Sequence, residues 1–232
     1  TNFIQLSNAS TLNPLTGNAL YGIYSYKWAG LTHTTGDPQG YLNGLVSTDY
    51  SNILSKTTLG NMVYNGPARP TSYGSFRNNF SYDQLTLSIN FTYELGYYFR
   101  RNSYESSSLP WQGNIDYFDR WQKPGDELTT NVPSFQLPPY TSGRDAFYQY
   151  SSALVDKGDN IRLKDIRLSY ELDKSKIKGL PFSHISIYGY ADNIGIIWRA
   201  NKDHLDPDLV IGSSLSSYPL PRTYAFGIKA NF

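Results

Sequence analysis

The strongest constraint on the fold is a strict two-residue alternation along residues 85–97. Odd positions carry apolar or aromatic side chains, and the even positions between them carry polar or small ones. The apolar set is Leu85, Leu87, Ile89, Phe91, Tyr93, Leu95 and Tyr97, and the other set is Thr86, Ser88, Asn90, Thr92, Glu94 and Gly96. Successive side chains of a strand point to opposite faces, so this pattern predicts a two-faced strand. It is longer than a typical soluble strand of about 5 to 6 residues and close to the roughly 9 to 11 of a bilayer-crossing one.

Further alternating segments predict more strands of the same kind. Residues 72–82 should form a hairpin with the 85–97 strand, through a tight turn at Asp83. Residues 161–172 and 182–191 read as a second hairpin with a short, lysine-rich turn, and residues 224–232 as the last strand. Residues 19–29 are a sixth candidate. The aromatics Tyr97, Tyr98 and Phe99 are expected to form an interfacial girdle.

Short turns alternate with long connections. The long ones cover residues 31–69, 100–159 and 193–221, and they are polar and rich in Gly, Pro, Ser and aromatics. Transmembrane barrels of the outer membrane have short periplasmic turns and long extracellular loops. We therefore expect these three connections to face the outside of the cell, with the 85–97 strand running outward and the last strand inward.

Composition excludes several functions. The chain of 232 residues has 21 Tyr, no Cys and a formal net charge of +1, with basic and acidic residues interspersed. It has no electrostatic footprint for nucleic acid, and it lacks thiol nucleophiles, disulfides and thiolate metal ligands. No apolar run is long enough for a transmembrane helix, but the mean hydropathy of −0.47 does not exclude barrel strands, because only one face of each is apolar.

The last strand ends on an aromatic residue. Tyr224, Phe226, Ile228 and Phe232 lie on one face of the alternating segment, and Phe232 is the final residue. Chain termini usually fray into water, so an apolar terminus needs another explanation. The pattern resembles the signal by which the outer-membrane insertion machinery recognises its substrates, and we assign these four residues to assembly.

Several stretches in order along the chain resemble a known family. They are residues 21–31 (YGIYSYKWAGL), 35–41 (TGDPQGY), 120–127 (RWQKPGDE), 159–166 (DNIRLKDI), 206–208 (DPD) and 218–224 (YPLPRTY). Their order and spacing resemble the C-terminal third or quarter of the SusC/RagA family of TonB-dependent outer-membrane transporters of Bacteroidetes.

The resemblance implies an all-β fold: the C-terminal strands of a 22-stranded antiparallel transmembrane barrel, with about six full strands and long extracellular loops. Residues 1–232 would be the C-terminal part of this barrel, without the plug domain and the TonB box. The implied partners are the N-terminal remainder of the barrel, a SusD-like lipoprotein, TonB–ExbB–ExbD acting through the missing part, and outer-membrane lipid. The implied function is uptake of oligosaccharides or oligopeptides. Six strands are too few to close, so residues 21–28 and 224–232 should pair with strands supplied by a second chain.

Other interpretations are weaker. Asp116, Asp119, Asp126 and Glu127 resemble a glycosidase pair only in residue type, and we expect no enzyme, no cofactor and no metal. The cluster Asp203, His204, Asp206 and Asp208 has carboxylates suited to Ca²⁺ but lacks the spacing of an EF-hand. The loop aromatics Trp111, Tyr117, Phe118, Trp121 and Tyr140 suit sugar or peptide stacking, although packing is the commoner role. The main alternative is a secreted carbohydrate-binding β-sandwich.

Overall fold

The computed structural model describes residues 8–10, 12, 14–107, 114–173, 181–210 and 219–231. It divides the chain into two compact units. We call Pro70–Gly96 with Gly158–Phe232 the sheet unit, and Thr1–Arg69 with Tyr97–Lys157 the loop unit. Among the described residues, no helix is both long enough and apolar enough to cross a membrane.

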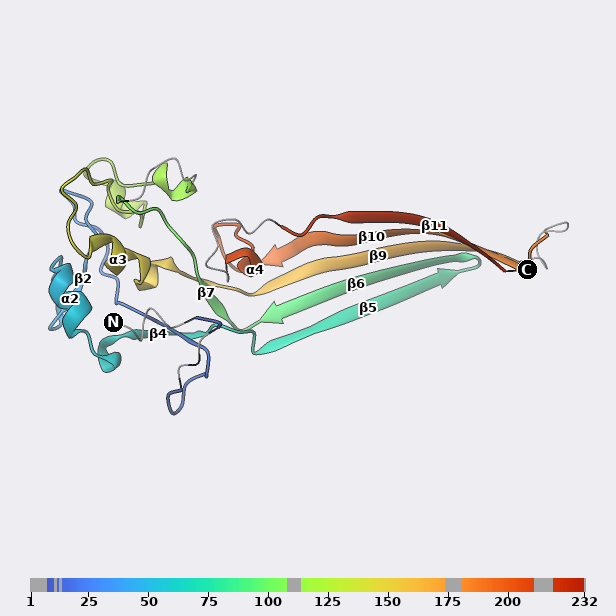
Figure 1. Cartoon of the computed structure of the whole chain (residues 1–232), viewed down its shortest axis with the longest axis horizontal. Helices are drawn as coiled ribbons and strands as arrows, with labels where there is room; N and C mark the ends of the chain where they lie inside the picture. The colour runs from blue at the N-terminus through green and yellow to red at the C-terminus, as the bar shows by residue number, and fades with distance from the viewer. Residues whose placement is uncertain are drawn as a thin grey trace. The chain divides into compact units, whose positions relative to one another are not determined.

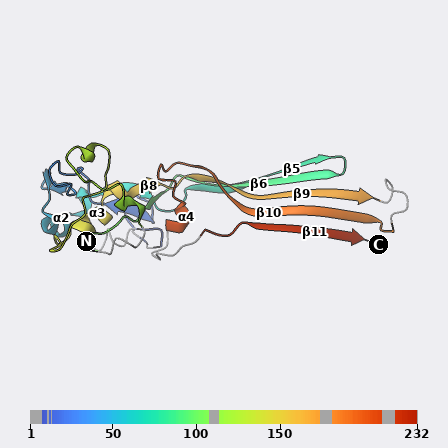
Figure 2. The same ribbon diagram turned by 90° about the horizontal axis from the view of Figure 1, so that it is seen from above.

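The sheet unit is a five-stranded antiparallel sheet in the order β11-β10-β9-β6-β5. Figure 1 shows the five strands side by side, and Figure 2 shows the same array from above. The strands are β5 (Ser72–Tyr82), β6 (Leu85–Leu95), β9 (Asn160–Asp173), β10 (His184–Arg199) and β11 (Thr223–Asn231), with a short helix α4 (Pro207–Val210) between the last two. This arrangement confirms the antiparallel, all-β fold class.

The first predicted hairpin is confirmed. Tyr82 of β5 pairs with Leu85 of β6, and Asp83 adopts a left-handed φ of 51°, a conformation that Asp tolerates better than most residues. The turn is fixed to β9, because Gln84 accepts hydrogen bonds from the Glu171 amide (2.8 Å) and from the Tyr170 hydroxyl (2.8 Å).

The second predicted hairpin is confirmed in its pairing, from His184 opposite Asp173 onward. Its turn, residues 174–180, lies outside the described residues. Strand β10 is longer than predicted, since it continues to Arg199 through stretches assigned above to a loop. Bulges between Asp192 and Gly195 and between Ile196 and Trp198 disrupt the two-residue alternation there, which hid this part of the strand.

The sheet remains open, as predicted for a chain with too few strands to close. In the described part of the chain, β5 and β11 form its two edges, and each pairs with one neighbour only. The prediction that residues 21–28 form one of these edges is wrong. Only Gly22–Ser25 (β1) is a strand there; it has four residues and belongs to the loop unit. All four residues of β1 are buried, so its apolar positions serve a core.

The loop unit contains short elements. Its strands are β1 (Gly22–Ser25), β2 (Gly40–Leu42), β3 (Leu45–Ser47), β4 (Val63–Pro67), β7 (Tyr98–Arg100) and β8 (Val155–Lys157), which pair as β1-β4, β2-β3 and β7-β8. Its helices are α2 (Tyr50–Lys56), α3 (Arg144–Gln149) and the 3-10 turns η1 (Leu59–Asn61), η3 (Ile115–Tyr117), η4 (Asp126–Leu128) and η5 (Ser152–Leu154).

The core of the loop unit is aromatic. Tyr26, Tyr50, Ile53 and Phe147 form its centre, and Phe147 is fully buried. The guanidinium of Arg100 connects three backbone segments of this unit. It donates hydrogen bonds to the carbonyl oxygens of Tyr24 (2.8 Å), Gln149 (3.3 Å) and Ser151 (2.9 Å). Burial lowers the pKa of Arg100 to about 10, so it stays charged at neutral pH. Connections predicted as long loops therefore form an ordered, packed unit.

The predicted aromatic girdle is also wrong. Strand β6 ends at Leu95, because Gly96 adopts a left-handed φ of 75° and turns the chain. Tyr97 and Phe99 then enter the loop unit, where only 1% and 3% of their surfaces are exposed. They are core residues rather than a belt at the end of the sheet.

Candidate functional site

One face of the sheet is apolar across all five strands. The register places Phe76 opposite Phe91, and Phe80 opposite Leu87, so the apolar positions of neighbouring strands share a face. The set comprises Phe76, Phe80, Leu87, Ile89, Phe91, Tyr93, Ile161, Leu163, Ile166, Leu168, Ile185, Ile187, Tyr224, Phe226 and Ile228. Its side chains are half-buried along β6 and exposed toward both edges of the sheet, up to 60% for Phe76 of β5 and 88% for Phe226 of β11. A continuous exposed apolar patch of this kind marks a surface for contact with lipid or protein.

The opposite face is polar and internally hydrogen-bonded. Asp165 of β9 accepts hydrogen bonds through Oδ2 from the guanidinium of Arg77 (3.0 Å) and from the side-chain amide of Asn90 (2.9 Å). Arg77 also donates to the Ser88 hydroxyl (3.3 Å). These residues come from three adjacent strands, so the network fixes the register of β5, β6 and β9. The two faces thus have the division of a barrel wall with a polar interior.

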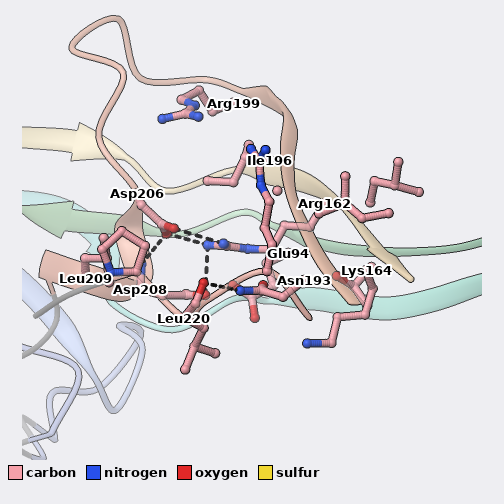
Figure 3. A pocket seen from close by; sticks show the side chains of 16 residues that line it. Glu94, Arg162, Lys164, Asn193, Ile196, Arg199, Asp206, Asp208, Leu209 and Leu220 are labelled. Atoms are coloured by element: carbon pink, nitrogen blue, oxygen red, sulfur yellow. Dashed lines mark hydrogen bonds and ion pairs between the residues drawn. The ribbon is translucent and has the colours of Figure 1, made fainter. Parts of the chain in front are cut away.

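A cavity of about 420 Å³ lies at one end of the sheet. Figure 3 shows its lining side chains, which come from β6, β9, β10 and the segment between β10 and β11. The charged ones are Glu94, Arg162, Lys164, Arg199, Asp206, Asp208 and Arg222. Both signs of charge therefore meet in one cavity, and we treat it as the candidate functional site.

Arg162 is the organising residue of this cavity. Its guanidinium donates to Asp206 through Nη1 (3.0 Å to Oδ2) and Nη2 (2.5 Å to Oδ1), a bidentate pair, and Nη2 also lies 2.8 Å from Asp208 Oδ2 (Figure 3). Arg162 lies in β9, whereas the two carboxylates precede and begin α4. The ion pairs therefore tie the segment after β10 to the strand wall.

The two carboxylates differ in their electrostatic environments. Burial alone would raise the pKa of Asp206, but the hydrogen bonds and charge of Arg162 outweigh it and hold this pKa below its ordinary value. Burial raises the pKa of Asp208, and the attraction of Arg162 does not fully compensate. Asp206 is therefore the firm anchor, and Asp208 is the carboxylate that protonates first on acidification.

The residues considered for calcium do not gather into one site. Asp206 and Asp208 face Arg162, which neutralises them, while the backbone carbonyl of His204 accepts a hydrogen bond from Arg199. No group of three or more His, Asp or Glu within the described ranges is arranged to hold a metal ion. The sequence placed Arg162 and the 206–208 motif in separate family-like stretches, and only the fold shows that they bind each other.

Two other family-like motifs meet inside the loop unit. Trp121 packs so closely on Gly36 that an added Cβ would lie 2.3 Å from its ring, and Gly36 has a φ of 66°, so only glycine fits there. Arg144, 2% exposed, donates to Asp37 (2.7 Å) and to the carbonyl of Ser134 (2.8 Å). The motifs of residues 35–41 and 120–127 are therefore structural contacts that order this unit.

The loop carboxylates do not form a hydrolytic pair. Asp116 binds Arg101 (2.5 Å), and Asp126 accepts hydrogen bonds from the backbone amides of Gln122 and Lys123. Glu127 accepts from His33 (2.6 Å), from the indole of Trp121 (3.1 Å) and from the Gly125 amide (2.8 Å). The His33 hydrogen bond, joined by the other two, lowers the pKa of Glu127 to about 2, the opposite of what a general acid requires.

The loop aromatics divide into packed and exposed side chains. Trp121 is buried, and Tyr117 stacks edge-on against Tyr104 at a centroid distance of 5.7 Å. Phe118 and Tyr140 remain 75% and 45% exposed, so they are the ones available to a partner or ligand. Trp111 lies outside the described residues.

The residues assigned to the assembly signal fall on the edge strand β11. Tyr224, Phe226 and Ile228 lie on the apolar face and pair with Ala191, Gly189 and Ile187 of β10. They are 64%, 88% and 73% exposed. Phe232 lies outside the described residues. The assignment to assembly remains a prediction.

Comparison of the sequence with known proteins indicates one class of protein. No protein-family model matches the sequence. A curated relative, TonB-dependent receptor P26 of Formosa agariphila, is 25% identical over 205 residues, 82% of this chain and 19% of that receptor. The chain therefore spans about a fifth of the relative. The class of protein indicated is that of TonB-dependent receptors.

Solved structures show that the fold is similar to part of a known transporter. The RagAB peptide transporter matches 95% of this chain and 24% of its own, with a TM-score of 0.66 and 21% identity. The RagAB peptide importer in its open-open state gives a TM-score of 0.65 at 20% identity over 95% of this chain and 24% of its own. In its closed-closed state it gives 0.65 at 19% over 90% and 23%. The resemblance is thus to a SusC/RagA-like TonB-dependent transporter, at low identity and over a portion of its length, as the sequence predicts.

Proposed function

We propose that the chain is the C-terminal part of an outer-membrane, TonB-dependent nutrient importer of the SusC type. The complete importer takes up oligosaccharides or oligopeptides together with a SusD-like surface lipoprotein. Residues 1–232 supply barrel strands and extracellular loops, while the plug domain and the TonB box belong to the N-terminal remainder of the transporter. TonB–ExbB–ExbD acts through that remainder.

The two-faced open sheet is the observation that carries this proposal. Its apolar face is exposed on every strand, while its polar face is held by the Arg77–Asp165–Asn90 network. A secreted β-sandwich would cover the apolar face with a second sheet, whereas a barrel strand exposes it to lipid. Within the described residues, β5 and β11 each leave one edge unpaired, and these edges require partner strands, since an open edge in hydrocarbon costs several kcal/mol per unsatisfied group.

The cavity around Arg162 supports a role in handling polar cargo. It opens among side chains of the polar face, such as Glu94 and Arg162, which in a barrel point to the interior. Its mixed charges suit ligands with charged or hydroxyl groups. The structurally similar RagAB is a peptide importer, so an oligopeptide is one cargo to test beside an oligosaccharide.

The assembly role of Tyr224, Phe226, Ile228 and Phe232 forms part of the proposal. Three of them present an aromatic or apolar stripe on an edge strand, the strand that an insertion machinery has to recognise and pair. Deleting Phe232 should lower the amount of barrel in the outer membrane of cells. Normal amounts of inserted barrel combined with failed uptake would contradict this role.

The function is tested in cells that carry the complete transporter gene and the gene of the proposed lipoprotein partner. Labelled oligosaccharide and oligopeptide pools are offered to wild-type cells, to cells lacking this gene and to cells lacking TonB. The proposal expects that uptake of at least one pool disappears in both deletions, and that the protein fractionates with the outer membrane. Unchanged uptake of both pools, or recovery of the protein from the culture medium, would overturn it.

A further inference from the structure

A second cavity lies within the loop unit and has a different chemistry. Its volume is about 560 Å³, in the range of small-molecule sites. It is formed where the β2-β3 hairpin turn, the end of α2 and the start of β4 come together over Tyr26. The turn residues Asn43 and Gly44 both have positive φ, 50° and 82°, which suits the tight hairpin that forms one wall.

The lining of this cavity is basic and carries no carboxylate. Lys27 and Lys56 supply the charge, and the side-chain amides of Asn43 and Asn61 supply hydrogen-bonding groups, while the hydroxyl of Thr57 donates to the backbone carbonyl of Ile53 (2.6 Å). The chain has a formal net charge of only +1, so two ammonium groups around one cavity without an acidic side chain are a local excess of positive charge.

Each lysine has a favourable local interaction that does not neutralise its charge. The ammonium of Lys27 lies 4.6 Å from the centroid of the Tyr41 ring, a cation–π contact. Lys56 occupies the last turn of α2, where a cation interacts favourably with the helix dipole. Both side chains are exposed. The charge of Lys56 interacts with the carboxylate of Asp49, but Asp49 is not among the residues that line the cavity.

Tyr26 also lines the cavity, but its hydroxyl is buried and does not open into it. Tyr26 is 2% exposed, and its hydroxyl has no hydrogen-bond partner among the described residues. A buried hydroxyl without a partner is uncommon, because it loses its hydrogen bonds to water. The polar groups that a ligand can meet are therefore the Lys27 and Lys56 ammonium groups and the side-chain amides of Asn43 and Asn61.

We propose that this cavity binds the carboxylate group of a short acidic ligand, with Lys27 and Lys56 as its cationic contacts and the amides of Asn43 and Asn61 binding neighbouring polar groups. This site would give the proposed importer a preference for acidic cargo. The inference that the ligand is cargo rests on the proposed function. An acidic oligosaccharide and an acidic oligopeptide share the chemistry, so both serve as probes.

The test measures equilibrium binding by calorimetry to the complete transporter with its lipoprotein. The four probes are an oligogalacturonate, its neutral methyl ester, a glutamate-rich hexapeptide and its glutamine counterpart. At least one acidic probe should bind roughly tenfold more tightly than its neutral partner, and this preference should shrink as salt is raised from about 0.01 to 0.15 M. Oligogalacturonate preference identifies a sugar cargo, and hexapeptide preference a peptide cargo.

A double Lys27→Gln and Lys56→Gln variant should abolish the preference, while Lys123→Gln removes one charge from an exposed position of the same unit and should preserve it. Equal binding of acidic and neutral probes, or a preference that survives in the double variant, overturns the site. Uptake by cells separates the two proposals: neutral cargo imported without any acidic preference leaves the importer function standing and removes this cavity from it.

Discussion

The two units of the chain use aromatic residues in opposite ways. In the loop unit, Phe147 and Tyr26 are 0% and 2% exposed and form a core. In the sheet unit, Phe76 and Phe226 are 60% and 88% exposed on one face. Both arrangements satisfy the same requirement, since apolar surface has to leave water. One unit buries it internally, and the other leaves it for an external apolar medium.

This difference shows that strand content alone does not identify a membrane protein. The four-residue strand β1 is covered on both sides, whereas the eleven-residue strand β6 has one polar face and one apolar face. Length and sustained alternation distinguish a wall strand from a core strand. The following substitutions test whether the two units respond to mutation as this comparison requires.

The largest effect is expected in the loop unit core. Phe147→Ala should destabilise that unit by about 3 to 5 kcal/mol, because a fully buried ring leaves a cavity. The matched control Phe118→Ala, at a side chain 75% exposed, should change stability by less than about 0.5 kcal/mol. Hydrogen exchange of the Tyr26 and Ser152 amides, which donate to Tyr150 and Tyr26, reports the local stability in the complete transporter. Equal exchange in both variants would break the comparison.

Charge on the apolar face should have the next largest effect. Phe91→Arg in the middle of β6 should cost about 2 to 4 kcal/mol of unfolding free energy in lipid vesicles, because the guanidinium enters hydrocarbon. Asn79→Arg is the control, since Asn79 pairs with Ser88 on the polar face and is exposed. Guanidinium titrations of both variants should differ by most of that cost. A larger loss from Asn79→Arg would reverse the assignment of the two faces.

The Arg162 anchor should show a moderate coupling. Arg162→Gln and Asp206→Asn should each cost about 1 to 3 kcal/mol, and the double variant should cost less than their sum, because both remove one partly buried pair. A double-mutant cycle on the complete transporter gives this coupling. Arg222→Gln lines the same cavity and, combined with Asp206→Asn, should be additive. If the free-energy costs of Arg162→Gln and Asp206→Asn simply added, the two side chains would not interact and the anchor would be refuted.

The smallest effect is the acid dependence of the Glu127 contacts. The folded-state pKa is lowered to about 2 by the His33, Gly125 and Trp121 hydrogen bonds, so their stabilisation is present above the ordinary pKa of a glutamate. It is lost as pH falls through about 2. The fluorescence or indole NMR signal of Trp121 should therefore change with a midpoint near pH 2, and Glu127→Gln should remove this transition. A midpoint near 4.5 would show that Glu127 lacks these contacts in solution.

The sequence predicted the sheet better than the loop unit. The alternation of β6 and β11 is strict, so side-chain period and face followed directly from the residues. Residues 19–29 misled because Tyr24, Tyr26 and Trp28 recur at every second position, whereas the strand there, β1, is only four residues long and buried on both sides, which the period alone does not reveal. The extension of β10 to Arg199 was hidden by two bulges.

The candidate site was largely invisible in the sequence. Arg162 and Asp206 are 44 residues apart, and no local pattern links a strand residue to a loop carboxylate. The same holds for Gly36 and Trp121, whose contact depends on the fold of the loop unit. Family-like motifs indicated that these residues matter, but the partner of each became clear only from tertiary structure.

The orientation of β6 tests the central claim most directly. These 232 residues contain no cysteine, so single Cys substitutions at 87, 89, 91 and 93 and at 88, 90, 92 and 94 can carry spin labels, once any cysteine elsewhere in the complete transporter has been replaced, in lipid vesicles. The account predicts that collisions with oxygen, which concentrates in lipid, are high at the four odd positions and low at the four even ones. Collisions with a water-soluble nickel complex should show the reverse alternation. A label at 91 facing the aqueous interior, or a label at 94 in lipid, would contradict the assignment of this sheet as a barrel wall.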